Sequence, residues 1–473
     1  MRRSQAIGLA TGLALLPRLS RAEEPISAEQ RAELTQLLSE AAHAPETIGF
    51  SVAVSYNGVD AFEAARGKRT LDPDAPSTVD TWYCIGSVTK QFTAALIMQL
   101  VEANRLALDA KLATVLADFP HAAEITFRQL LTHTSGLAEY TARTRAAALM
   151  ARTGVPPAEL VALIAGQPLD FTPGAQWEYS NSNYLALGLT IERLSGKPYA
   201  QVLRERIVQP LGLAVNPGPP TSGEIARGYG SEPTPTPMPP SDISWAYAAG
   251  EIYATTGGLL AWNKALFGGR VVSAASLAQM TTPMKLASGT SSDYGFGLFV
   301  LTVRGHRIIS HNGGVPGGFA AQNFVFPDDG LAIATLANTL YFNVALPAPK
   351  IADVFLPGVS DLLDLISRQH VAELDDPEIR RRAREWIGRL KSGSWETSQL
   401  TPEMVAVMTP EAVKPGRTII ETAGTVKDLH LAGFALRGGY RIYVYNVTGT
   451  TGTFVFTFVL DHRDKIAGLF VKP

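Results

Sequence analysis

The chain has 473 residues, of which 46% are hydrophobic and 18% charged, and its formal net charge is -2. This composition is typical of a globular protein that is long enough for one large domain and a smaller one. The near-neutral charge, without a basic stripe interleaved with aromatic residues, argues against nucleic acid as a partner.

Residues 1–22 have the layout of a secretory signal. Two arginines precede an apolar run from Ala6 to Leu16, and a small-residue cleavage site ends at Ala22. The run is about half of the roughly 20 residues that a membrane-spanning helix needs. We therefore expect cleavage near Ala22, a secreted or periplasmic protein and no stable membrane insertion. The adjacent arginines leave a twin-arginine export route open.

The next part of the chain predicts strands, then helices, then strands again. Residues 27–42 predict a helix capped by Ser27, and residues 48–67 predict two strands that turn at Asn57-Gly58. Apolar residues recur at spacings of three and four from Ser87 to about residue 106. Further helices are expected around residues 125–132, 157–166, 183–195, 199–210 and 257–269.

Strand-like alternation returns over residues 294–338, after a proline- and glycine-rich stretch at 216–240 that we interpret as a long surface loop. Both ends of this region then belong to one antiparallel sheet. The predicted fold class is α+β, with an antiparallel sheet flanked by helices and an all-helical subdomain, over residues 23–345.

A second, small α+β domain is expected at residues 376–473, after a linker at 346–375. Residues 377–390 predict an amphipathic helix with a positive face, which is typical of a solvated surface. From Thr418 to the end, alternating residues predict antiparallel strands.

The sequence lacks the motifs that several other classes of protein chemistry require. The single cysteine, Cys84, allows no intramolecular disulfide, and we interpret it as a small buried hydrophobe. No H-E-x-x-H pattern or Cys/His cluster occurs, and phosphate- and dinucleotide-binding glycine patterns are missing. We expect no metal and no cofactor. The G-x-S-x-G motif of α/β-hydrolases is also absent.

The stretch "CIGSVTKQF" places Ser87 three residues before Lys90 at the start of a predicted helix. Residues three apart share a helix face, so the amine can take the proton of the hydroxyl and make it a nucleophile. A capping serine with a surface lysine is the plain alternative. Free N–H groups at a helix start favour a developing anion, which supports the catalytic interpretation.

A second candidate lies in "EYSNSNYLALG". Tyr179 and Asn181 are two residues apart in an extended loop and face the same side, as a phenol that passes protons and an amide that orients a substrate carbonyl. The alternative is a helix-capping turn, in which we expect Ser182 or Asn183 to cap. A second match, Tyr341 to Asn343, comes at a strand end and is discounted.

A third candidate is "SHNGGVPGGF", with His311 and Gly313 after a strand. Glycine lets a substrate lie against the strand edge, and the N–H groups of Gly314 and Ser87 together can form an oxyanion hole. A lone histidine is more often structural. A rival, Lys391-Ser392-Gly393, ends the positive helix of the second domain, with Gly393 as its C-cap.

The order Ser87-x-x-Lys90, Tyr179-x-Asn181, His311-x-Gly313 resembles the three motifs of the serine β-lactamase-like superfamily, in its class C β-lactamase, D,D-carboxypeptidase and esterase branch. "FRQLLTHTSGL" and "FTPGAQWEYSNSNYLALGLTIERLSGKPYAQVL" also resemble that family's framework, over about residues 30–345. The resemblance implies a penicillin-binding-protein-like transpeptidase fold. It makes Ser87 the acylated nucleophile, with Lys90 and Tyr179 sharing the base role. It places Asn181 in contact with the substrate amide. It places His311, Gly313 and Gly314 on the opposite wall of the substrate pocket from Asn181, here called the far wall.

One departure bears on the substrate. Typical β-lactamases of this branch carry lysine where His311 stands, so a fixed cation for the drug carboxylate is missing. An unperturbed imidazole loses its charge around pH 6.5, so anionic substrates are expected to be favoured only in acid. The expected function is a secreted serine hydrolase acting on D-amino-acid peptides, esters or β-lactams, and less an efficient β-lactamase. The alternative is a penicillin-recognising sensor or adaptor with little turnover. The oligomeric state stays open.

Overall fold

The computed structural model describes residues 25–44, 47–142, 152–230, 236–237, 243–286, 289, 291–315, 318–339, 348–360, 377–437, 440–461 and 464–472. The secretory signal expected at residues 1–22 and the second Tyr-x-Asn match at 341–343 lie outside these ranges. No helix in the described ranges is long and apolar enough to span a membrane.

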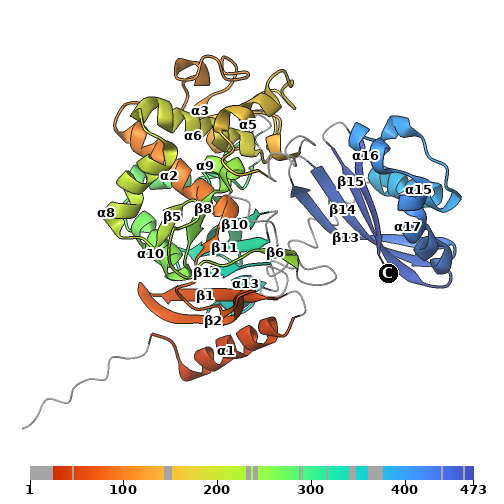
Figure 1. Cartoon of the computed structure of the whole chain (residues 1–473), viewed down its shortest axis with the longest axis horizontal. Helices are drawn as coiled ribbons and strands as arrows, with labels where there is room; N and C mark the ends of the chain where they lie inside the picture. Colours follow the sequence, from red (N-terminus) through yellow and green to blue (C-terminus); the bar gives the residue numbers. More distant parts are fainter. Residues whose placement is uncertain are drawn as a thin grey trace, which may run out of the picture.

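A seven-stranded antiparallel sheet is the centre of the larger domain (Figure 1). Its order is β3-β2-β1-β12-β11-β10-β9, so strands from both ends of the domain meet in the middle, where β1 pairs with β12. The turn between β1 and β2 contains Asn57 and Gly58, both at positive φ, as predicted. The strands are β1 (Gly49–Tyr56), β2 (Val59–Leu71), β3 (Asp74–Pro76), β9 (Phe299–Val303), β10 (His306–Val315), β11 (Phe319–Phe326) and β12 (Leu331–Ala337).

Both faces of the sheet are covered by helices, so the central strands β1, β11 and β12 are buried along most of their length. Successive side chains alternate between two core clusters: Phe324 faces one and Val325 the other. Helices α1 (Ala28–Ala42) and α13 (Ala348–Asp353) cover the first face. Ser27 begins α1 with the side-chain cap that the sequence predicted.

The other face packs on the helical part of the domain, which lies on the opposite side of the sheet from α1 in Figure 1. Helix α2 (Thr89–Glu102) runs through this core and is buried on nearly all sides. The other α-helices of this part, within the described residues, are α3 (Phe127–Leu131), α5 (Pro157–Ile164), α6 (Asn181–Ser195), α7 (Tyr199–Leu203), α8 (Gln209–Leu211), α9 (Tyr247–Gly250), α10 (Thr256–Phe267) and α11 (Ala274–Met280). Short strands complete it: β4 (Tyr83–Cys84), β5 (Val215–Pro217), β6 (Tyr229–Gly230), β7 (Thr236–Pro237) and β8 (Ile252–Ala254).

The second domain has its own core, with helices packed against a four-stranded antiparallel sheet of order β13-β14-β15-β16. The strand pattern expected from Thr418 onward is wrong at its start, because Thr418 lies in α17, an amphipathic helix with Pro415 inside it. The elements are α15 (Pro377–Ser392), α16 (Pro402–Val407), α17 (Pro410–Ala423), β13 (Val426–Arg437), β14 (Tyr440–Gly449), β15 (Thr453–Leu460) and β16 (Ile466–Lys472).

Residues 348–360, the described part of the stretch 346–375 that we expected to be a linker, are part of the larger domain. Helix α13 and the residues after it bury Ile351, Phe355 and Val359 against the sheet. The short helix and its turn have too few residues for a clear helical period, so the sequence pattern did not reveal them. The α+β fold with a separate small sheet domain is otherwise as predicted.

Candidate active site

Ser87 and Lys90 lie one turn apart at the start of the buried helix α2. Ser87 is in the short 3-10 helix η1 (Gly86–Val88) and is half-buried, whereas Lys90 is fully buried. Lys90 Nζ and Ser87 Oγ are 3.1 Å apart, within hydrogen-bonding distance. The pair is therefore in direct contact, and Lys90 is not a surface lysine.

Two further oxygens hold the Lys90 amine. Its Nζ donates to Asn181 Oδ1 at 2.8 Å and to the carbonyl oxygen of Ala249 at 2.9 Å. Burial lowers the pKa of Lys90 to about 7, and the negative charge of Glu139 opposes this shift. The neutral amine has two hydrogens for these two acceptors, which leaves its lone pair for the proton of Ser87.

The turn that carries Ser87 lies directly against strand β10. A side chain at Gly313 would collide with the carbonyl oxygen of Ile85, and one at Gly86 would come within 3.1 Å of the Gly314 nitrogen. Gly86 also has φ +50, a left-handed conformation that favours glycine. Gly313 and Gly314 are thus brought to Ser87. Strand β9 pairs with β10 only as far as Ser310, so within the described residues no strand pairs with this edge of β10 beyond that point.

Tyr179 lies over the same lysine. Lys90 Nζ is 4.8 Å from the centre of the Tyr179 ring, and among the described residues the buried Tyr179 hydroxyl makes no hydrogen bond of normal geometry. Burial raises the pKa of Tyr179 well above its ordinary value, and the nearby Ser87 hydroxyl opposes this only in part. Tyr179 is therefore a neutral phenol at physiological pH.

Asn181 is the first residue of α6 and faces Lys90 through its Oδ1. The expected cap at Ser182 or Asn183 is wrong, because Ser180 occupies the N-cap position and makes no side-chain cap bond. Ser182 lies inside α6, and its hydroxyl donates a hydrogen bond to the carbonyl oxygen of Ala138.

His133, which we read as part of the framework, holds the segment before α6. Its Nδ1 accepts hydrogen bonds from the Ser180 N–H at 3.2 Å and from Asn183 Nδ2 at 3.0 Å. Its ring is fully buried and lies 4.3 Å from the Tyr179 ring, centre to centre. These contacts orient the loop that carries Tyr179.

His311 is buried on the far wall, with 2% of its surface exposed. Its Nδ1 donates to the carbonyl of Asn312 at 2.7 Å, so its Nε2 accepts from the Tyr294 hydroxyl at 3.0 Å. Burial, followed by the charge of Lys90, lowers the pKa of His311 to about 3, against the effect of the Asn312 carbonyl. The expectation of a charge change around pH 6.5 is therefore wrong, because this imidazole is desolvated and stays neutral.

Aromatic side chains that sequence reasoning missed complete this wall. The Tyr294 hydroxyl forms a hydrogen bond with His311, and the centre of the Phe299 ring lies 5.3 Å from that of the His311 ring. The Trp177 ring packs against the rings of Tyr294 and Phe299. A cavity of about 1410 Å³ includes Trp177 and Phe299 in its lining but not Ser87. The candidate active site is defined by its reactive groups, Ser87 and Lys90, and this cavity lies beside it.

Glu139 was missed as well. It lies in the loop that leads from α3 towards α5 and accepts a hydrogen bond from the Asn181 backbone N–H at 2.5 Å. In the sequence it is one acid in "SGLAEYT", 42 residues from Asn181. No spacing rule connects two loops that far apart.

The rival motif is not at this site. Lys391 and Ser392 end α15 in the second domain, and Lys391 Nζ donates to the carbonyl of Gly424 at 2.8 Å. Gly393 follows at φ +73, as a helix C-cap does.

Comparison with known proteins gives one family. The Beta-lactamase family profile matches residues 34–354. A relative is the putative penicillin-binding protein PbpX of Bacillus subtilis, 31% identical over 278 residues, which are 56% of this chain and 64% of that protein. The chain thus spans less than two thirds of this relative's length.

Solved structures agree on the fold. A D-stereospecific amidohydrolase from Streptomyces matches with a TM-score of 0.57 and 29% identity, over 69% of this chain and 98% of that chain. The octameric penicillin-binding protein homologue from Pyrococcus abyssi has a TM-score of 0.60 and 21% identity, over 91% of this chain and 90% of that chain. The chain belongs to the Beta-lactamase family.

Proposed function

We propose that this protein is a serine hydrolase in which Ser87 forms an acyl-enzyme with an ester or amide substrate. The observation that carries the proposal is the contact of Ser87 with Lys90, whose pKa is lowered to about 7 by burial. Near neutral pH a large fraction of this amine is uncharged and can accept the hydroxyl proton. Ser87 is half-exposed, so a substrate can reach it.

The proposed steps use these groups in turn. Ser87 Oγ attacks the carbonyl carbon while its proton passes to Lys90, and the oxyanion is stabilised by the N–H groups of Ser87 and Gly314. Tyr179 passes a proton to the leaving group as the carbonyl re-forms, and Lys90 returns the proton to Tyr179. Water then hydrolyses the ester at Ser87, with the free acid as product.

The substrate is proposed to be a small molecule or peptide that is uncharged next to the reacting bond. Supporting this, the wall at His311 is neutral and aromatic, so it has no fixed cation for a carboxylate. Esters and D-amino-acid peptides or amides fit such a wall better than carboxylate-bearing β-lactams. The similarity to the Streptomyces D-stereospecific amidohydrolase is in line with this choice.

A second candidate function is a penicillin-recognising sensor or adaptor, which becomes acylated but turns over poorly. The similarity to a putative penicillin-binding protein supports it. The two functions differ in the second half of the reaction. A hydrolase returns to its free mass within seconds to minutes of acylation, whereas a sensor keeps the acyl group.

The test is intact-mass spectrometry of the protein with a fluorophosphonate, a penicillin and a panel of esters and D-amino-acid amides. We expect a single stable fluorophosphonate adduct on Ser87, none in Ser87→Ala, and turnover of at least one neutral ester or amide. An adduct on another residue, or full turnover by Ser87→Ala, would overturn the proposal. A long-lived acyl-enzyme with every substrate would favour the sensor.

We also propose that residues 1–22 direct export, which places the hydrolase outside the cytoplasm. The arginines and apolar run at this end support it. N-terminal sequencing of the protein from the periplasmic or external fraction tests it. A mature chain that still begins at Met1 would contradict it.

A further inference from the structure

Glu139 is a buried carboxylate without an ion-pair partner in the described part of the chain. Only 4% of its surface is exposed, and no lysine, arginine or histidine there lies within ion-pair distance. Its hydrogen bonds come from neutral donors: the Asn181 N–H at 2.5 Å, and the N–H and hydroxyl of Thr141, both at 2.8 Å. Burying a carboxylate is costly, so its presence here needs a physical reason.

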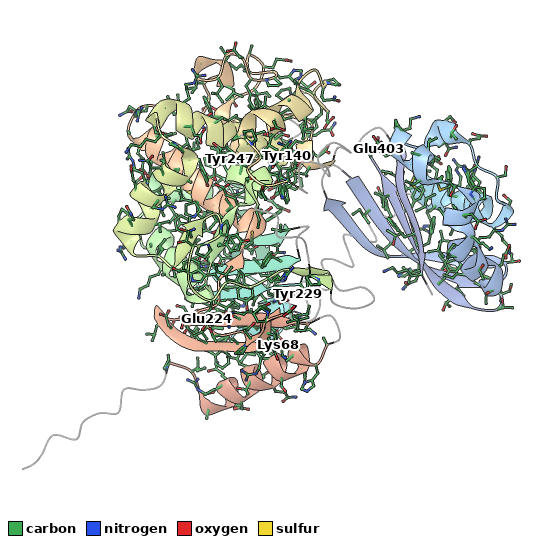
Figure 2. All side chains as sticks on the ribbon, in the orientation of Figure 1. Lys68, Tyr140, Glu224, Tyr229, Tyr247 and Glu403 are labelled. Atoms are coloured by element: carbon green, nitrogen blue, oxygen red, sulfur yellow. The ribbon has the colours of Figure 1, made fainter. Side chains whose placement is uncertain are left out.

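One effect of Glu139 is on the start of α6. Ser180, at the N-cap, provides no side-chain cap, and Glu139 accepts the first helical N–H from another loop instead. Thr141, held by the same carboxylate, lies 3.4 Å from Asn181 Nδ2. The Asn181 amide is thus fixed with its Oδ1 directed at Lys90 Nζ. Figure 2 labels Tyr140, the residue that follows Glu139 in the sequence, in the helical part of the larger domain.

A second effect is electrostatic. The titratable groups that act on or pack around Lys90 are Glu139, Tyr179, Tyr184, His133 and His311. Burial raises the pKa of both tyrosines and lowers the pKa of both histidines, so all four are neutral at physiological pH. Glu139 is then the one charged group of this set that acts on Lys90, and it favours the protonated amine.

We propose that Glu139 is a positioning residue of the active site, which fixes the Asn181 amide against Lys90 and controls with its negative charge how readily Lys90 gives up a proton. This inference rests on the proposed function, because it needs Lys90 to take the proton of Ser87. A helix cap without a role in the reaction is the competing explanation. It predicts a loss of stability, or an equal loss of rate at every pH.

The experiment measures the rate at which an uncharged fluorophosphonate labels Ser87, from pH 5 to 9, in the full-length protein. The bond formed is Ser87 Oγ to phosphorus, fluoride leaves, and Lys90 takes the proton, so the acid limb of the curve follows Lys90. The variants are Glu139→Gln, which keeps an acceptor for the Asn181 N–H but removes the charge, and Glu139→Asp, which keeps the charge. Glu192→Gln is the matched control, because Glu192 lies on α6 and, like Glu139, accepts a backbone N–H, in this case from Tyr199.

In Glu139→Gln we expect the acid limb to move about one pH unit lower, because the negative charge that favours the protonated amine of Lys90 is removed. Labelling at pH 6 relative to pH 8.5 then rises about fivefold, whatever the absolute rate. Glu139→Asp and Glu192→Gln keep the wild-type midpoint. Circular dichroism shows which variants are folded.

If Glu139→Gln is folded and its curve has the wild-type midpoint, this inference is wrong while the proposed function stands. An acid limb that moves to higher pH would overturn it equally. If Glu139→Gln does not fold, Glu139→Asp decides: a wild-type midpoint supports the role of the charge, and a midpoint that moves lower by about one pH unit although the charge is kept contradicts it. If the wild type is not labelled at Ser87, the proposed function itself fails.

Discussion

The carbonyl oxygen of Ile85 occupies the space that a side chain at Gly313 would fill, so strand β10 and the turn before Ser87 touch at this point. The contact aligns the strand that carries His311 and Gly314 with the nucleophile. This contact is possible because Gly313 has no Cβ atom.

Gly313→Ala should therefore separate Ser87 from β10. We expect labelling of Ser87 and turnover to fall about 10²-fold or more, because an error of about 1 Å in an active site has effects of this size. The control is Gly388→Ala in α15, where nothing lies within 4 Å of the new methyl group. A folded Gly313→Ala protein with normal rates would show that this contact does not position the site.

Lys90 and Tyr179 should act as a unit. Lys90→Met and Tyr179→Phe should each lower the acylation rate about 10²- to 10⁴-fold, since each removes a group that carries the same proton. The double variant should lose little more than the worse single variant. Single-turnover kinetics with an activated ester measures this. Losses that multiply would mean that the two residues serve separate steps.

The pH profile of kcat/KM for a neutral ester should have an acid limb with its midpoint near pH 7. Lys90 has its pKa lowered to about 7, and only the neutral amine accepts a proton, so activity is lost as the pH falls through this value. The midpoint should persist in His311→Gln. A flat profile between pH 5 and 9 would show that Lys90 is not the proton acceptor.

The preference between a neutral ester and its carboxylate analogue should not depend on the charge of His311. The pKa of His311 is lowered to about 3, so its imidazole stays neutral from pH 5 to 9. We expect the ratio of the two kcat/KM values to be constant over this range. Replacement by lysine should improve the carboxylate analogue relative to the ester. A ratio that changes around pH 6.5 in the wild type, but not in His311→Gln, would contradict the buried neutral state.

We propose that the chemistry resides in residues 23–360 and does not need the second domain. A chain of residues 23–360 should fold and be labelled at Ser87. A chain ending at residue 345 should be at least about 3 to 6 kcal/mol less stable, because the fully buried side chains that it loses include Ile351 and Val359, at about 1.5 to 3 kcal/mol each. Denaturant unfolding of the two chains measures the difference. Equal stability would show that residues 346–360 are dispensable.

Local pattern was sufficient for much of the fold. Alternation over residues 48–67 and 294–338 predicted strands of one antiparallel sheet, and the cap at Ser27 and the Asn57-Gly58 turn formed as expected. These features depend on neighbours within a few residues, so they are readable from sequence. Helices α13 and α17 were missed because one is too short to show a period and the other contains Pro415.

The chemistry-bearing stretches were also readable, because Ser87 and Lys90 share one helical turn. The protonation states of these groups could not be predicted from the sequence. Whether Lys90 has a pKa about 7, and whether His311 carries a charge, depends on how completely each side chain is removed from water and on which oxygens face it. Those surroundings come from segments far apart in the chain, such as Ala249, Asn181 and Tyr294. Desolvation is a property of the packed fold, so no motif spacing could have supplied it.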